Sequence, residues 1–408
     1  MKMRRTKFVK RDDTILLLTS TFPRWKKDQV PLFVYDQAKI MKNFFGSVLV
    51  LAPHYPHARR GEILEGIQIS RFQYFYPESS QNIAYGGFKT NNNVIAVVKA
   101  ICYVLMQIIY TLIISIKHKP KVINAHWLLP QGLSALLAKQ VFGSKMIVNI
   151  HGGDVFTLNS RFSRAIKKAI LKRSDVVIAN SSVTKREAQL LLDREYVVIP
   201  EIVDVEKFTS AHKNKEKHDG FNIVFIGRLS EEKGVIYLLE AVNLIKKNMN
   251  SKDMQLKIVG DGPERAKLQQ YVDSSRLNSF VEFVGWKQRD ELVDIFKTTD
   301  VFVGPSIKSD SGWKEAFGIV FAEASSAGVP VITTDQGGMI DIVDDGNTGF
   351  IIDQKSAKLI AEKLNVLYDD RGYSRMMGEK AHKRAIKLFS KNAVQTKYKK
   401  ILDEVMSL

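Results

Sequence analysis

The sequence predicts an α/β protein built from two doubly wound parallel-sheet domains that face a cleft. Short runs rich in valine and isoleucine alternate with stretches of helical periodicity through both halves of the chain. This alternation is typical of parallel sheets with helices on both faces. The chain has 408 residues, which exceeds the length at which one hydrophobic core keeps growing. Two domains of roughly 200 residues are therefore expected.

The predicted strands follow one another in order along each half. Valine and isoleucine favour strands, and continuous apolar runs are typical of strands buried on both faces of a sheet. These runs are residues 15–20, 47–53, 122–126, 145–151, 175–181 and 196–200, and then 222–227, 256–260, 281–285, 300–306 and 329–334.

The domain boundary is expected near residue 200. The segment from 200 to 220 contains VDVEKF and then TSAHKNKEKHDG, which is charged and rich in residues that break regular structure. Residues 1–200 are therefore assigned to an N-terminal domain and residues 201–389 to a C-terminal domain.

Net charge and cysteine content indicate the cellular compartment and the kinds of partner to expect. Cys102 is the only cysteine, so no internal disulfide can form and a reducing, cytoplasmic compartment is expected. The basic N-terminus leads into an apolar run too short for a signal sequence. A net charge of +18 fits a polyanionic partner, an anionic membrane surface or a basic soluble protein.

One basic amphipathic helix is predicted over residues 161–173. Its cations recur at steps of three and four residues and share one face, opposite an apolar face formed by Phe162, Ile166, Ala169 and Ile170. Such a helix can lie on anionic lipid at the inner face of the cell membrane, or it can simply expose a solvated face. The cations are Arg161, Arg164, Lys168 and Lys172.

An uncharged apolar run extends from residue 100 to residue 116. Its length is near the lower limit for a membrane span. Lys99 cuts the run and Gln107 lies within it, and a predicted core strand follows closely. The run is therefore predicted to be a helix covered by its domain, and whether it touches a membrane stays open.

The turn after the predicted strand 222–227 is the first candidate site. The strand ends at Gly227, Arg228 follows, and Lys233 precedes Gly234 where a helix is expected to begin. Free backbone N–H groups at a helix N-terminus bind anions. Two cations beside such a turn suit a diphosphate leaving group, whereas the structural alternative makes both of them surface residues.

Two carboxylates form the second candidate site. Glu315 and Glu323 lie eight residues apart in EAFGIVFAE; a helix is expected to start near Phe317, so Glu315 lies at its entry and Glu323 two turns inside it. Two glutamates on one helix usually indicate solvent exposure. Here the apolar and small neighbours indicate a buried site, and carboxylates suit the hydroxyl groups of a sugar and a ribose. Together the two sites indicate nucleotide-sugar chemistry.

These motifs resemble those of the retaining family 4 glycosyltransferases, also called glycosyltransferase group 1, which have the GT-B fold. The resemblance covers nearly the whole chain. It includes GRL and KG around Gly227, the E-x7-E spacing, IVGDGPERAKL from Ile258, VEFVGW from Val281, AGVPVITTDQGG from Ala327 and HGGD from His151. It implies two Rossmann-like domains, with the last helix, at about 390–408, crossing back onto the first.

The resemblance also assigns roles to residues. Glu323 would bind the ribose, Glu315 would face the donor sugar, and His151 would contact that sugar while Asp154 arranges donor or acceptor groups. His126 is either structural or on the acceptor side. The remaining predicted donor-binding residues are Gly227, Gly260, Val284, Gly285, Trp286, Phe317, Gly318, Ile319 and Val320.

The function implied is retaining transfer of a hexosyl group from a nucleotide-diphosphate sugar to a surface glycan or a lipid-linked acceptor, in polysaccharide biosynthesis. The nucleotide sugar is a co-substrate, and no other cofactor is expected. Because no Asp-x-Asp motif ends a predicted strand, no metal ligand is expected either. The alternatives are a sugar-nucleotide epimerase or hydrolase of the same fold, and a non-enzymatic polyanion-binding protein. No motif supports nucleic-acid binding.

Overall fold

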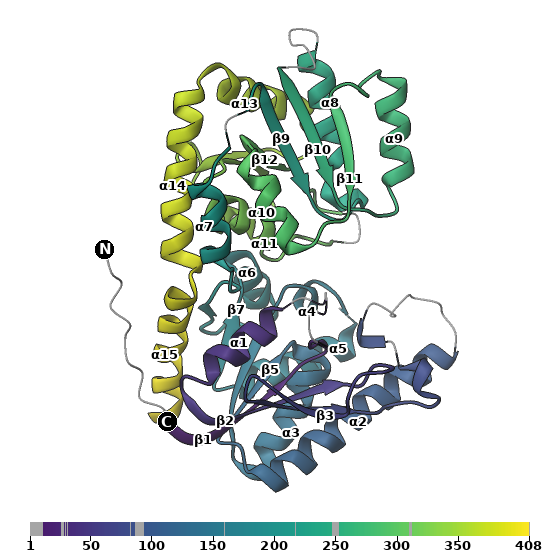
Figure 1. The fold of residues 1–408 in the computed structure, drawn as a ribbon. Helices are drawn as coiled ribbons and strands as arrows, with labels where there is room; N and C mark the ends of the chain where they lie inside the picture. The colour runs from purple at the N-terminus through teal and green to yellow at the C-terminus, as the bar shows by residue number, and fades with distance from the viewer. Residues whose placement is uncertain are drawn as a thin grey trace. The chain divides into compact units, whose positions relative to one another are not determined.

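The computed structural model describes residues 11–25, 28, 30, 32–81, 83–85, 94–158, 160–216, 218–246, 253–309 and 312–407. These residues form two compact units (Figure 1). The first unit takes in the described residues of Met1–Asn180, Lys185–Ile202 and Gln395–Leu408. The second takes in those of Ser181–Thr184 and Val203–Val394.

The first unit is built on an eight-stranded sheet with the order β3-β4-β2-β1-β5-β6-β7-β8. Its strands pair in parallel except at the β3–β4 edge, which is antiparallel. They are β1 (Arg11–Leu18), β2 (Phe45–Pro53), β3 (Gly61–Leu64), β4 (Ile67–Phe72), β5 (Val122–His126), β6 (Lys145–Ile150), β7 (Val176–Ala179) and β8 (Val197–Val198).

The β3–β4 hairpin was not expected from the sequence. Leu64 pairs with Ile67, so the loop between the strands has only two residues, Glu65 and Gly66. Both have positive φ, 50° and 75°. Two residues with positive φ are typical of a type I′ turn, whose twist matches that of the flanking strands. The Glu-Gly pair was the local signal for this hairpin.

The second unit is built on a six-stranded sheet with the order β11-β10-β9-β12-β13-β14, in which every pair is parallel. The strand order reverses between β9 and β12, and ligands of such sheets bind at the carboxyl ends of the strands at this point. The strands are β9 (Phe221–Ile226), β10 (Met254–Val259), β11 (Val281–Gly285), β12 (Val301–Gly304), β13 (Val331–Thr334) and β14 (Gly349–Ile352).

Helices connect the strands in both units. In chain order they are α1 (Phe33–Met41), α2 (Val94–His118), α3 (Leu133–Phe142), α4 (Gly153–Phe156), α5 (Arg161–Arg173), α6 (Ser182–Leu191), α7 (Val205–Lys213), α8 (Val235–Ile245), α9 (Arg265–Ser274), α10 (Arg289–Lys297), α11 (Ile319–Ser326), α12 (Met339–Ile342), α13 (Ala357–Asp369), α14 (Arg371–Phe389) and α15 (Lys391–Ser407). Shorter turns lie at Glu78–Ser80, Ile83–Tyr85, Leu128–Gly132 and Glu231–Lys233.

Alternate residues of the strands face opposite sides of the second sheet, as the period of a strand requires. In β9, Ile223 and Phe225 belong to a core cluster that includes residues of α8 and α13. Val224 belongs to a second cluster with residues of α7, α10 and α11. The sheet is therefore covered on both faces, as the continuous apolar run predicts.

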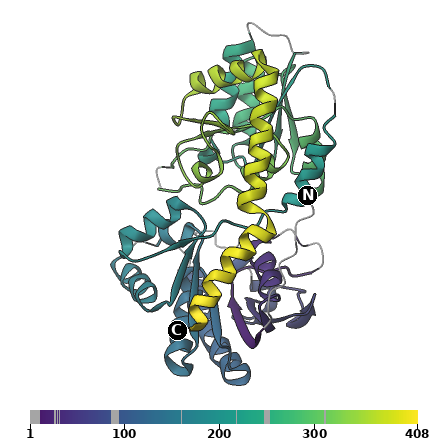
Figure 2. The ribbon, with the colours of Figure 1, turned by 90° about the vertical axis from the view of Figure 1, so that its left-hand side faces the viewer.

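Most of the last helix, α15, packs on the first unit. The described residues of 395–408 belong to that unit, and the helix runs beside its strands (Figure 2). The hydroxyl of Tyr398 lies 3.4 Å from the side-chain oxygen of Asn149 in β6. Tyr398 is buried, so the contact forms part of the core.

The apolar run at residues 100–116 was predicted to be a helix covered by its domain. That prediction is wrong. The run forms α2, but only 17% of its most apolar 18-residue window is buried. The buried side chains of α2 all carry a polar group: Tyr103, Gln107, Thr111 and Ser115. Among the described residues, α2 is the one helix long and apolar enough to cross a membrane, by length and composition.

The basic helix forms as predicted, but its apolar face differs. Ser160 caps α5 by accepting the N–H of Ser163. Phe162, expected on the packed face, is 76% exposed, whereas Lys167 is buried and its Nζ donates to the carbonyl of Thr157 at 2.5 Å. Burial lowers the pKa of Lys167. The four cations predicted to share a face are all exposed.

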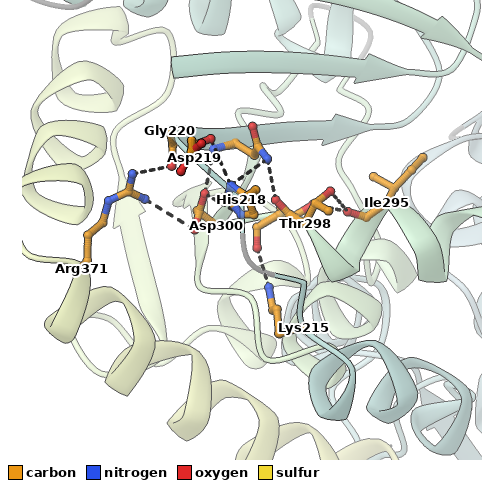
Figure 3. Close-up of polar contacts among 10 residues, drawn as sticks. Lys215, His218, Asp219, Gly220, Ile295, Thr298, Asp300 and Arg371 are labelled. Carbon is orange, nitrogen blue, oxygen red and sulfur yellow. Dashed lines mark hydrogen bonds and ion pairs between the residues drawn. The ribbon is translucent and has the colours of Figure 1, made fainter. Parts of the chain in front are cut away.

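A polar cluster ties the segment before β9 to the second sheet (Figure 3). Asp300, directly before β12, accepts the backbone N–H of Asn222 at 2.8 Å. Its other carboxylate oxygen lies 3.5 Å from the guanidinium of Arg371, which also donates to the carbonyl of Gly220 at 2.7 Å. His218 lies 3.5 Å from the same carboxylate. The cluster fixes where β9 begins.

Lys215 lies in this cluster, and it is expected to make the free energy of unfolding depend on pH in the alkaline range. Its Nζ donates to the carbonyl of Thr299 at 2.5 Å (Figure 3). Burial lowers its pKa to about 8, although Asp300 opposes that shift. The unfolded lysine keeps a pKa near 10.4. Because the folded state loses this proton first, the free energy of unfolding is expected to rise between pH 7.5 and 9.5, by less than the full pKa shift implies, since the Lys215 side chain is partly exposed and solvent screens its charge.

Urea unfolding at the two pH values checks this expectation. In Lys215→Met the rise should be absent, whereas the exposed control Lys358→Met should keep it, since other groups titrate alike in both proteins. An equal rise in wild type and Lys215→Met would contradict the assignment to Lys215.

Candidate functional site

The turn after β9 is packed tightly against the turn after β10. A Cβ atom on Gly260 would overlap the carbonyl oxygen of Gly227, and one on Gly262 would overlap the carbonyl oxygen of Leu229. Only glycine allows this approach of two backbones. Gly260 therefore holds the turn of Gly227 in place, a role that the sequence did not indicate.

The same turn feeds α8 through a glycine in the left-handed region. Gly234 has φ +65° and precedes the first residue of α8, Val235. A Cβ on Gly234 would overlap the carbonyl oxygen of Pro305, which follows β12. The backbone N–H of Ile307 donates to the carbonyl of Glu232 at 2.8 Å. The loops that follow β9 and β12 are thus joined at the point where the strand order reverses.

Lys233 and Glu315 meet at this point. The Nζ of Lys233 forms an ion pair with a carboxylate oxygen of Glu315 and lies 5.0 Å from the ring centre of Trp313. Both charged side chains are partly exposed. Arg228 is exposed, and its guanidinium has no ion-pair partner among the described residues. Two cations and one carboxylate therefore lie on the loops after β9 and β12.

The loop that carries Glu315 is held by the segment after β13. The backbone N–H of Gly338 donates to the carbonyl of Glu315 at 2.8 Å, and the side chain of Gln336 accepts the N–H of Glu315 at 3.3 Å. Gly337 has φ +77°, and a Cβ there would overlap the carbonyl of Glu315. The glycine pair thus positions Glu315 by close backbone packing.

The helix after Glu315 begins later than predicted. Its first residue is Ile319, because Gly318 has φ +83° and cannot continue a right-handed helix. Phe317, predicted to bind the donor, is buried and packs edge-on against Phe389 with ring centres 5.6 Å apart. Ile319 and Val320 are partly buried against the same core.

Glu323 is buried in α11 and is paired with Arg289, the first residue of α10. The Nε of Arg289 lies 2.9 Å from the carboxylate of Glu323, which is only 5% exposed. Burial raises the pKa of Glu323, and the positive charge of Arg289 opposes that shift. A buried carboxylate fixed by one arginine keeps further oxygen lone pairs free for hydroxyl groups.

The segment predicted to contact the base lies at the sheet edge formed by β11. Val284 is partly buried, and Gly285 has φ +76° with open space where a Cβ would stand. Trp286 is 56% exposed. The indole ring is therefore accessible for stacking.

His151 lies in the first unit, directly after β6, between two polar partners. Its Nδ1 is 2.8 Å from the carboxylate of Glu201, and its Nε2 is 3.0 Å from Nδ1 of His126, at the end of β5. The two imidazole rings stack with centres 5.2 Å apart. Burial lowers the pKa of His126 well below its usual value, and His151 adds to that shift. His126 is therefore neutral near pH 7.

Asp154, in α4, holds the backbone around this histidine pair. Its two carboxylate oxygens accept the N–H of His151 at 3.1 Å and the N–H of Leu128 at 3.2 Å. Burial raises the pKa of Asp154, and these hydrogen bonds oppose the shift. The carboxylate acts on the loops that carry the histidines; its predicted contact with a substrate stays a prediction.

The structure thus gathers the predicted residues into separate groups. Lys233 and Glu315 lie together in the second unit, and Glu323 lies with Arg289 in the same unit; His151 and Asp154 lie together in the first unit. Arg289, Glu201 and Trp313 were not predicted. Among the described residues, no three His, Cys, Asp or Glu side chains group closely enough to hold a metal ion.

Two family models match the chain. The model of glycosyl transferases group 1 matches residues 206–384, and the model of glycosyltransferase family 4 matches residues 34–207. Together the two matches run from residue 34 to residue 384.

Curated proteins similar to this chain are glycosyltransferases. The chain is 26% identical over 294 residues to N-acetyl-alpha-D-glucosaminyl L-malate synthase of Bacillus anthracis, a match that covers 70% of this chain and 75% of that protein. It is 29% identical over 261 residues to a GDP-mannose-dependent alpha-(1-6)-phosphatidylinositol monomannoside mannosyltransferase of Mycobacterium tuberculosis, covering 61% of this chain and 67% of that protein.

Solved structures show the same fold. Sucrose-phosphate synthase of Thermosynechococcus elongatus matches with a TM-score of 0.76 and 20% identity, over 97% of this chain and 99% of that chain. HepE of Anabaena in complex with UDP matches with a TM-score of 0.71 and 18% identity, over 96% and 100%. The predicted fold class, two Rossmann-like domains of the GT-B type, is confirmed. The chain belongs to the family 4 glycosyltransferases, the glycosyl transferases of group 1.

Proposed function

We propose that this glycosyltransferase moves a hexosyl group from a nucleotide-diphosphate sugar to a surface glycan or a lipid-linked acceptor, with retention of the anomeric configuration. The observation that carries the proposal is the Lys233–Glu315 pair on the loops where the strand order of the second sheet reverses. A cation at this place suits a diphosphate, and a carboxylate beside it suits sugar hydroxyls. The reported complexes of HepE with UDP and UDP-glucose support a nucleotide-sugar donor.

The roles in the donor site follow from charge and burial. Lys233 and the exposed Arg228 would stabilise the negative charge that develops on the departing diphosphate. Glu323, fixed by Arg289, would accept the ribose hydroxyls. Trp286 offers an exposed ring to the base. The acceptor hydroxyl would attack the anomeric carbon from the side on which the phosphate leaves, and its proton would pass to the departing phosphate oxygen. No divalent ion or other cofactor is proposed.

His151, in the first unit, would contact a substrate hydroxyl. With the Nδ1 proton donated to Glu201, Nε2 of His151 can accept the N–H of His126. A substrate hydroxyl at Nε2 would replace that hydrogen bond, so Glu201 positions the ring for the exchange. Asp154 is a positioning residue for the same loop.

We also propose that the protein works in the cytoplasm, in peripheral contact with the inner face of the cell membrane. The exposed cations Arg161, Arg164, Lys168 and Lys172 of α5 support attraction to anionic lipid. A lipid-linked acceptor would be met at such a surface.

A donor panel tests the transfer reaction. Calorimetry with UDP- and GDP-linked hexoses is expected to identify one donor that binds, and a membrane extract that supplies acceptors should speed its consumption. Nuclear magnetic resonance of the product would give the anomeric configuration. Equal consumption without acceptor would indicate an epimerase or hydrolase instead, and failure of every donor to bind would favour a polyanion-binding protein.

A further inference from the structure

The helix α2 has its polar and apolar faces reversed with respect to an ordinary surface helix. Its inward face consists of Tyr103, Gln107, Thr111 and Ser115, spaced four residues apart. The side-chain nitrogen of Gln131 lies 3.4 Å from the Tyr103 hydroxyl and 3.5 Å from the Gln107 oxygen. These hydrogen bonds add to the hydrophobic contacts that the flanking residues Val104, Leu112 and Ile114 make with the core of the unit.

The outward face of α2 is a continuous apolar stripe. Its side chains recur at steps of three and four residues, as one face of a helix requires, and they are between 43% and 62% exposed. The helix has 25 residues and is therefore about 37 Å long. Apolar patches of this extent on a soluble unit mark an interaction surface. The α2 stripe consists of Val98, Ile101, Leu105, Ile109, Ile113 and Ile116.

Cations without counterions lie at the C-terminal end of the stripe. Ile116, Phe142 and Met406 line a hollow of about 620 Å³ together with Lys119, Lys121 and Lys145. None of these lysines forms an ion pair with another described residue, and the sequence from residue 94 to 121 contains no acidic side chain. The surface thus combines an apolar face with positive charge at its end.

This combination fits the surface of an anionic bilayer. The α2 stripe would contact the acyl chains of the lipid, and the lysines would form ion pairs with the lipid phosphates. Spanning does not fit, because Tyr103 and Gln107 are bonded to Gln131 of the same unit and the central strand β5 begins at Val122, four residues after α2 ends. A helix that lies flat in the interface keeps both contacts.

We propose that α2 lies in the headgroup region of an anionic phospholipid bilayer, with its stripe against the acyl chains and Lys119 and Lys121 at lipid phosphates. The inference deepens the proposed function, because it assigns the membrane contact to a named face of the first unit. Vesicle binding is measured without donor or acceptor, so its failure is distinguishable from failure of the transfer reaction.

Vesicle flotation tests the stripe. Wild type is expected to float with vesicles of phosphatidylcholine and phosphatidylglycerol. The double variant Leu105→Glu, Ile109→Glu is expected to lose affinity on the order of tenfold per position, because each isoleucine or leucine is replaced by a charge that does not enter the interface. The matched control is Leu244→Glu, Val366→Glu, which changes two exposed apolar residues of the second unit. Equal flotation of all three proteins would overturn the proposal.

A second pair of variants tests the charge. Lys119→Ala with Lys121→Ala is expected to lower affinity for the anionic vesicles roughly fivefold per lysine and to leave binding to pure phosphatidylcholine unchanged. The control is Lys358→Ala with Lys380→Ala on α13 and α14, where both lysines are exposed. An equal loss in the two double variants would show that net charge, not this end of α2, attracts the lipid.

A fluorescent label separates the lipid surface from other occupants, and it needs no charged substitution. Cys102 is the only cysteine, so Cys102→Ser, Ile109→Cys accepts one environment-sensitive dye on the stripe. Its emission should shift to the blue on addition of anionic vesicles, with quenching by shallow rather than central lipid probes. Quenching at the bilayer centre would indicate a span. A blue shift that follows protein concentration without vesicles, together with a dimer in light scattering, would make the stripe an interface between copies. Either result overturns the proposal.

Discussion

Replacing Lys233 with alanine is expected to lower the rate of glycosyl transfer by about 10²–10³. Two effects act in the same direction. The departing diphosphate loses a preorganised cation, and the carboxylate of Glu315, which pairs with Lys233, is left without its counterion beside a dianion. The variant is expected to fold normally, because Lys233 is partly exposed and lies in a short turn.

The measurement is kcat/KM with the donor that the panel identifies. The control is Lys358→Ala, which removes an exposed lysine from α13 of the same unit. Both variants should keep the wild-type melting temperature. A Lys233→Ala enzyme with wild-type kcat/KM would remove this lysine from the diphosphate site, and it would leave Arg228 as the remaining candidate.

The sequence predicts most strands of the two sheets, though not β3, β4 or β14, because the signals of buried strands are local. A strand buried on both faces is a continuous apolar run, and β9, its glycine turn and α8 follow directly from residues 222–245. The prediction for α2 fails because an apolar run does not say which of its faces packs inward. There the most buried side chains include Gln107 and Thr111, and a row of apolar residues points out.

The partners in the candidate site are less predictable because they are distant in the chain. Arg289 and Glu323 are 34 positions apart, and His151 and Glu201 are 50 apart. Each pair forms only once the strands lie in order, and nothing near Arg289 or Glu201 in the sequence indicates a partner. The motif residues themselves are recognised by resemblance, since their types and spacing are local.

Replacing Asp154 with alanine is expected to lower the free energy of unfolding by about 2–6 kcal/mol. The carboxylate is buried, and it accepts the backbone N–H groups of His151 and Leu128. Alanine leaves both N–H groups without an acceptor in a dry environment, and each such group costs about 1–3 kcal/mol. Because native proteins are stable by only about 5–15 kcal/mol, this loss is a large share of the total.

The variant Asp154→Asn distinguishes the loss of one of these two hydrogen-bond acceptors from the loss of both. An asparagine oxygen replaces one acceptor, whereas its amide nitrogen faces the other N–H as a second donor, so about half of the loss should remain. Urea unfolding of both variants measures it, with the exposed Asp193→Ala in the same unit as the control. If Asp154→Ala unfolds at the wild-type midpoint but loses transfer activity, the carboxylate acts on the substrate rather than on the loops. The predicted role of Asp154 in arranging donor or acceptor groups would then be the better description. If stability and activity fall together and Asp154→Asn is intermediate in both, Asp154 acts through the position of His151.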